Sequence, residues 1–107
     1  MKLRFDKQTL RLRLSESDLD QIKHTGFVEA QVQFPGNALT YRLQIDPVSE
    51  QTTCSYDKNL ILVTIPHHLA LAWMESEEEG TYASVPTSGQ AEPLRIMVEK
   101  DFPCKHL

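Results

Sequence analysis

Two side chains near the end of the chain carry donors that bind soft metal ions. Cys104 and His106 supply a thiolate and an imidazole two positions apart, and a histidine brought in by the fold, such as His67, would add a third ligand. Zinc sites need three or four donors of this kind. Neither a Cys-x-x-Cys nor a His-Glu-x-x-His spacing is present, so the competing interpretation makes Cys104 a small buried hydrophobic residue.

The same cysteine is a candidate nucleophile. Cys104 with His67 or His106 would form a thiolate-imidazole pair. Catalysis would further need an oxyanion hole and a cleft, and a chain of 107 residues has little room for a deep cleft beside its core. The glycines are isolated, and no Gly-x-Ser-x-Gly motif occurs. A cysteine-dependent enzyme therefore ranks third among the functions considered, after a metal-binding protein, and no cofactor is predicted.

The arginines give the leading prediction. All five alternate with apolar residues in strand-like segments, at Arg4, Arg11, Arg13, Arg42 and Arg95. A guanidinium group binds carboxylate and phosphate groups in a bidentate manner. If the strands are neighbours, these side chains form a cationic sheet face that would bind a small anionic ligand or an acidic protein partner. We therefore expect a small, non-enzymatic binding or interaction domain. The competing interpretation is a solvated face whose arginines pair across strands with Asp6, Glu29 and Glu99.

Charge and composition narrow the classes of partner and compartment. The net charge is −4, which argues against binding to duplex nucleic acid and to anionic membrane surfaces. The first residues contain no apolar core of a signal peptide, and no apolar stretch is long enough to span a bilayer. The two cysteines, Cys54 and Cys104, are then best interpreted as reduced thiols, and we expect a cytoplasmic location. The sequence leaves the oligomeric state open.

Alternation of apolar and polar residues predicts mostly antiparallel strands. In 27–34, for example, Val28, Ala30, Val32 and Phe34 are expected to face the core. The segment 60–65 is apolar at nearly every position, which indicates a central strand. The predicted strands are Lys2–Asp6, Thr9–Leu14, Phe27–Phe34, Leu39–Ile45, Thr52–Tyr56, Leu60–Ile65, Thr81–Val85 and Leu94–Lys100.

Two short helices are predicted between the strands. Ser15 followed by Asp18 resembles a capping box, and Gly26 suits the residue that ends a helix. Pro66 suits the start of a second helix, with Leu69, Ala72 and Trp73 on one face. The whole chain, 1–107, is thus expected to form a single α+β domain.

The two halves of the chain follow the same order: hairpin, helix, hairpin. The segment 10–14 before the first helix resembles 61–65 before the second, and each helix is followed by a glycine and a strand. This order predicts an internal pseudo-twofold repeat. Such a repeat would give a closed or nearly closed barrel of about eight strands with helices covering its ends; the alternative, which the sequence leaves open, is a sheet that does not close.

Two blocks of sequence resemble a known family. The first comprises residues 1–4 and 10–15, and the second comprises residues 94–102 followed by Cys104. Both resemble an uncharacterised bacterial family of short cytosolic proteins. The resemblance implies a shared fold and a bacterial cytosolic origin, but that family has no assigned activity, so it implies no functional residue.

Overall fold

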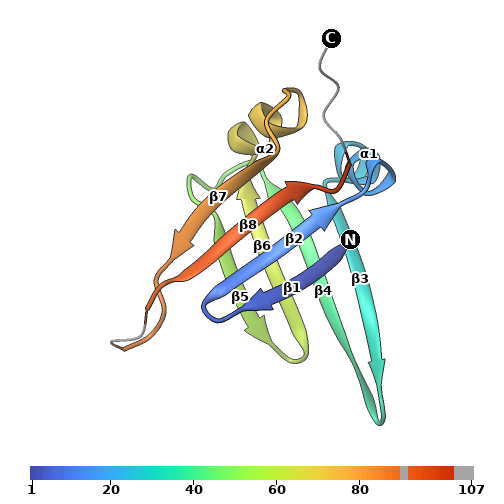
Figure 1. Ribbon diagram of the computed structural model, residues 1–107, viewed down its shortest axis with the longest axis vertical. Helices are drawn as coiled ribbons and strands as arrows, with labels where there is room; N and C mark the ends of the chain where they lie inside the picture. The colour runs from blue at the N-terminus through green and yellow to red at the C-terminus, as the bar shows by residue number, and fades with distance from the viewer. Residues whose placement is uncertain (90–91, 103–107) are drawn as a thin grey trace.

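The computed structural model describes residues 1–89 and 92–102 as two stacked sheets with two helices at one end (Figure 1). Sheet A has the strand order β1-β2-β8-β7, and sheet B has the order β3-β4-β6-β5. In each sheet the outer pairs are antiparallel and the central pair is parallel. The elements are β1 (Lys2–Asp6), β2 (Thr9–Leu14), α1 (Glu16–Thr25), β3 (Phe27–Phe34), β4 (Asn37–Asp46), β5 (Thr53–Asp57), β6 (Leu60–Pro66), α2 (His67–Met74), β7 (Gly80–Val85) and β8 (Leu94–Lys100).

The prediction of an α+β fold with mostly antiparallel strands is confirmed, and the prediction of a closed or nearly closed barrel is wrong. Among the described strands, β1 and β7 are the edges of sheet A, and β3 and β5 are the edges of sheet B. The sheets meet through apolar side chains on their facing surfaces and do not continue from edge to edge. Neither helix of the described chain has the length and apolar content that a membrane span requires.

The strand pairing repeats between the two halves of the chain, as predicted. β2 pairs in parallel with β8 in sheet A, and β6 pairs in parallel with β4 in sheet B. The backbone amide of Arg95 donates to the Gln8 carbonyl at 2.8 Å, and the amide of Thr40 makes the equivalent bond to the Asn59 carbonyl at 2.9 Å. A pseudo-twofold relation therefore joins β1-β2-α1-β3-β4 to β5-β6-α2-β7-β8.

Local signals set the bounds of α1 as the sequence predicted. The Ser15 hydroxyl accepts a hydrogen bond from the Asp18 amide at 3.1 Å, and the Asp18 carboxylate accepts one from the Ser15 amide at 3.0 Å. This capping box satisfies amides that lack partners inside the helix. Gly26 ends the helix with a φ of +87°, a conformation that glycine adopts without strain.

The predicted face of α2 is partly wrong. The helix follows Pro66, as expected, but Ala72 is exposed, and the buried residues are Ala70, Trp73 and Met74. Apolar residues occupy most of this short helix, so several faces are compatible with its sequence. The Trp73 indole Nε1 donates to the Glu79 carbonyl at 3.0 Å, which satisfies its one polar atom inside the core.

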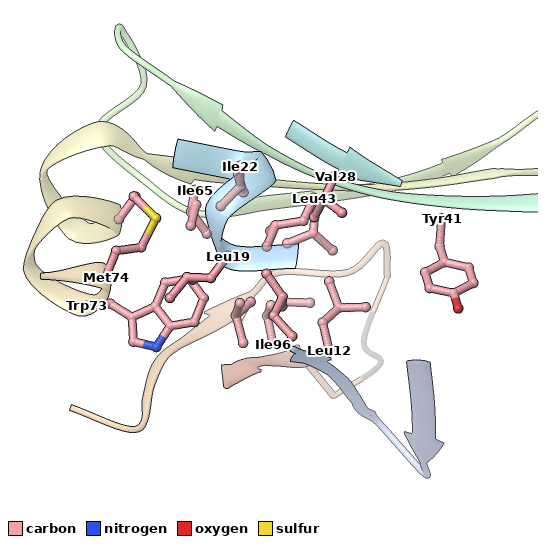
Figure 2. Packing of buried hydrophobic residues seen from close by; sticks show 14 of the residues in the cluster. Leu12, Leu19, Ile22, Val28, Tyr41, Leu43, Ile65, Trp73, Met74 and Ile96 are labelled. Carbon is pink, nitrogen blue, oxygen red and sulfur yellow. The ribbon is translucent and has the colours of Figure 1, made fainter. Parts of the chain in front are cut away.

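The core lies between the two sheets, close to the helices. Figure 2 shows Leu12 and Ile96 of sheet A pointing toward Leu43 of sheet B, with Ile22 and Trp73 closing the helical end. All five side chains are fully or almost fully buried. Ile22 and Trp73 hold equivalent places in the two halves, so each half contributes one large apolar side chain from its helix.

Two side chains predicted to be buried are exposed instead. Val32 is 43 % exposed and Phe34 is 52 % exposed, although both lie on the inner surface of β3. The end of the β3–β4 hairpin extends beyond sheet A, so none of the described strands covers these positions (Figure 1). Alternation therefore predicted the correct face of the sheet but not the length over which the other sheet covers it.

Candidate functional site

Four of the five arginines lie together on the outer surface of sheet A. Arg4 comes from β1, Arg95 from β8 and the other two from β2, and the inward residues that alternate with them reach the core. Lys2 of β1 lies on the same surface. We call this surface the arginine face, formed by Lys2, Arg4, Arg11, Arg13 and Arg95. Three carboxylates share it, from Asp6, Glu99 and Asp101, so positive charge is in excess.

One side of the arginine face is partly neutralised by Asp101. Its carboxylate lies 2.7 Å from the Lys2 Nζ and 3.1 Å from an Arg13 Nη. The hydrogen bond from Lys2, aided by the charge of Arg13, holds the pKa of Asp101 below its ordinary value. Within the described residues, the buried Arg13 Nε has no hydrogen-bond partner.

The centre of the face contains a buried carboxylate. Glu99 is only 4 % exposed, and it accepts hydrogen bonds from the Arg11 Nε and, at 3.0 Å, from the Tyr82 hydroxyl. Burial, together with the hydrogen bond to Glu99, raises the pKa of Tyr82. Gly80 lies opposite Glu99 in the β7–β8 register and leaves the room that this cluster needs.

The other two arginines of the arginine face, Arg4 and Arg95, are available to a ligand. The Arg4 and Arg95 side chains are exposed, and within the part of the chain that the structure describes neither guanidinium has an ion pair or hydrogen bond. Arg4 lies directly opposite Arg11 in the β1–β2 register. Beside this pair is a surface hollow of about 250 Å³, lined by Arg4, Asp6, Thr9, Arg11 and Met97. The arrangement offers cationic donors at a concave surface, which suits a phosphate or carboxylate group.

Arg42, the fifth predicted site residue, lies apart from the others. It is on the outer surface of sheet B, where its guanidinium lies 3.1 Å from the Glu29 carboxylate and 3.0 Å from the Gln44 amide oxygen. The same group lies 3.8 Å from the centre of the Phe27 ring. Arg42 thus uses its donors within its own sheet. This is the competing interpretation, in which the arginines pair with carboxylates across neighbouring strands.

The predicted metal ligands are not brought together within the described residues. Cys104 and His106 lie outside those residues, and His67 is exposed at the start of α2. Residues 1–89 and 92–102 contain no group of three histidine, cysteine or acidic side chains placed to hold a metal ion. Cys54 is a free thiol whose pKa is raised by burial, which is the opposite of the shift that activates a nucleophile.

Sequence reasoning missed the neighbours that shape this site. Tyr82 completes the Glu99 cluster, and Thr9 and Met97 line the hollow. Alternation places Thr9 and Met97 on the outer surface, which was a usable signal. The parallel pairing of β2 with β8 left no such signal in the sequence, because these strands are far apart along the chain and nothing local specifies their contact.

Comparison with known proteins gives a family without an activity. No curated protein and no solved structure matches the chain. A family model, described as a family of unknown function (DUF7009), matches residues 1–107. The predicted resemblance to an uncharacterised family is confirmed in this respect: the chain belongs to DUF7009, a family of unknown function.

Proposed function

We propose that this protein is a small binding domain, not an enzyme, and that its arginine face binds the phosphate or carboxylate group of an anionic ligand. Arg4, Arg11 and Arg95 supply the guanidinium donors, and the hollow beside Arg4 and Arg11 receives the anion. Arg13 helps through its charge and is already paired with Asp101. We place this function in the cytoplasm, since a free thiol such as Cys54 is typical of reducing compartments.

One observation carries the proposal: Arg4 faces Arg11 across two neighbouring strands, and no carboxylate among the described residues pairs with Arg4. Like charges placed directly opposite each other destabilise a sheet by some tenths of a kcal/mol. A bound anion between the two guanidinium groups would convert that repulsion into two charge-assisted interactions.

The pseudo-twofold repeat provides a second line of support. The inner positions of β2 and β6 are apolar in both halves, but the outer positions differ. The outer positions of sheet B that correspond to the four arginines of sheet A hold only neutral residues, Ser55, Leu62, Thr64 and Thr40. Since sheet B folds with neutral residues at these places, the fold itself does not require the arginines of sheet A.

The test measures binding of inorganic phosphate and of pyrophosphate by the rise in Tm that each ion causes. The reference is the Tm in chloride at the same ionic strength. A ligand at one hundred times its Kd stabilises the folded state by about 2.7 kcal/mol, which is readily measured as a rise in Tm. We expect Arg4→Gln to remove most of this rise. The matched control is Arg42→Gln, which removes an arginine from the outer surface of sheet B and should leave the rise unchanged.

Two outcomes would contradict the proposal. The first is a Tm that responds equally to phosphate, pyrophosphate and chloride at one ionic strength. The second is an equal loss of the phosphate effect in Arg4→Gln and Arg42→Gln, which would indicate general screening. A glutamate-rich peptide serves as a further arm: binding of the peptide without binding of phosphate would identify the alternative, an acidic protein partner.

A further inference from the structure

A second concave site lies on the other side of sheet A, between the two sheets. It is a pocket of about 310 Å³, and the side chains that line it come from both sheets. The lining contains no charged residue. Its members are Phe5, Leu10, Leu39, Cys54, Tyr56, Ile61 and Leu94.

The pocket lies on the pseudo-twofold axis, because six of its seven lining residues, all but Cys54, form equivalent pairs. Phe5 of β1 corresponds to Tyr56 of β5, since each pairs with the equivalent residue of the neighbouring strand, Leu10 or Ile61. Leu39 and Leu94 form the third pair. Leu94 directly precedes Arg95, whose amide donates to Gln8 in the β1–β2 turn. Leu39 directly precedes Thr40, whose amide donates to Asn59 in the β5–β6 turn. The two halves therefore build this pocket jointly and in the same way.

Among residues 1–89 and 92–102, no helix covers this end of the sandwich. The two helices follow the ends of β2 and β6, so they close the opposite end of the core, where Ile22 and Trp73 are buried (Figures 1 and 2). At the open end, Phe5 is 56 % exposed and Tyr56 is 71 % exposed, while the pocket floor of Leu10 and Ile61 is buried. Two aromatic side chains thus stand at the mouth of an apolar pocket.

We propose that this pocket binds a small, uncharged aromatic molecule of about the size of two fused rings. The volume sets the size, since apolar cavities of about 150 Å³ accept a single benzene ring. The neutral lining sets the charge, because a buried ionic group would have no partner there. Phe5 and Tyr56 set the shape, since aromatic rings pack favourably against a flat ring in stacked or edge-to-face arrangements.

Cys54 supports the same class of ligand and provides a way to observe it. Burial raises the pKa of its thiol, so the group is neutral at physiological pH and adds no charge to the pocket. A molecule seated in the pocket would cover the Cys54 Sγ and slow its alkylation by iodoacetamide. The measurement uses the full chain carrying Cys104→Ser, so that Cys54 is the only thiol present.

The probes are 2-naphthol, which is uncharged at neutral pH, and 2-naphthoate, in which a carboxylate replaces the hydroxyl group on the same ring system. We expect 2-naphthol to slow alkylation of Cys54 in a saturable way and to shift the amide resonances of Phe5, Leu39 and Leu94. We expect 2-naphthoate to protect Cys54 at least about tenfold more weakly, because the pocket would have to desolvate its charge.

Two variants that fill the pocket test its location from both sheets. Leu94→Trp in sheet A and Leu39→Trp in sheet B should each weaken 2-naphthol binding by about tenfold or more, because an indole would occupy the ligand's volume. Val48→Trp is the control: Val48 is 84 % exposed in a loop, and the variant should bind like the parent chain. Amide spectra of all three show whether the fold is retained, and the shifts in the parent chain test the site even if one variant fails to fold.

Several results would overturn the proposal. Absence of saturable protection by 2-naphthol, equal protection by the two probes, or unchanged binding in both filled variants would each do so. A stable dimer in sedimentation that is broken by Leu94→Trp and Leu39→Trp would also overturn it, since a second copy would then cover the open end. The 2-naphthol test is independent of the anion proposal. Arg4 lies on the opposite surface of sheet A from the pocket, so Arg4→Gln should not alter 2-naphthol binding.

Discussion

Gly80 is the position where a single methyl group should have the largest effect on the arginine face. A Cβ at this position would lie 2.8 Å from each of three atoms: the Glu99 Cγ, the Tyr82 hydroxyl oxygen and the Val98 carbonyl oxygen. The carbonyl belongs to the backbone of a central strand, and Glu99 is buried, so neither can move without disturbing the sheet. The Tyr82 ring must turn away, which breaks its hydrogen bond to Glu99.

The expected free-energy change for Gly80→Ala follows from these contacts. Overpacking a well-filled site costs about 1–3 kcal/mol, and the lost hydrogen bond to a carboxylate adds about 1.5 kcal/mol. Replacing glycine by alanine within a strand returns about 0.5–1 kcal/mol of backbone entropy. We therefore expect a net loss of about 1.5–4 kcal/mol, which lowers the Tm of a domain of this size by roughly 6 °C or more.

Thermal and urea unfolding of Gly80→Ala, Tyr82→Phe and the double variant measure this effect. Tyr82→Phe removes the hydroxyl group that the new methyl group would strike, and its own cost is about 1.5 kcal/mol for one hydrogen bond to a carboxylate. The double variant should cost about 1.5 kcal/mol less than the sum of the two single variants, because both single variants lose this one bond. Ser84→Ala, an exposed change on the same strand, is the control. The reasoning is refuted if Gly80→Ala keeps or raises the Tm, or if the two costs add.

Two further predictions concern the helix cap and acid stability. Ser15→Ala removes the acceptor of the Asp18 amide and should lower the free energy of unfolding by about 1 kcal/mol in urea titrations; Ser15→Asn, which can cap, should recover most of it. The pKa of Asp101 is lower in the folded state than in the unfolded chain, so its stabilising effect is present above the unfolded pKa and is lost as the pH falls through the folded pKa. Asp101→Asn should therefore flatten the fall in Tm below about pH 4, where the parent chain loses its bridge between Lys2 and Arg13; an identical acid profile would refute this.

Local signals explain how much of the fold was predictable from the sequence. The predicted strands and both helices are present, because alternation and helix caps act over a few residues. Ser15, Asp18 and Gly26 fix α1 by hydrogen bonds and backbone conformation within the segment itself. The order hairpin, helix, hairpin in both halves was also a local pattern, and it predicted the pseudo-twofold relation correctly.

The errors share a physical cause, which is contact between segments distant in the sequence. Nothing local specified that β2 pairs with β8 and β4 with β6, and so the sequence did not distinguish two stacked sheets from a closed barrel. Val32 and Phe34 alternate correctly but extend past the other sheet. Arg42 has the same local pattern as Arg11, yet the pairing places it on the outer surface of the other sheet.

The two halves of the chain separate what the fold needs from what it does not. Leu12 and Val63 occupy equivalent inner positions, and both are completely buried, so the sandwich sets the same demand on each half. The fold does not require a particular residue type at the outer positions, because sheet B folds with neutral residues where sheet A has its arginines. Sheet A holds like charges opposite each other at Arg4 and Arg11 and buries the Arg11–Glu99 ion pair, whose desolvation costs free energy that sheet B avoids. A surface that is costly and unnecessary for folding is the part of this molecule on which a functional experiment is most informative.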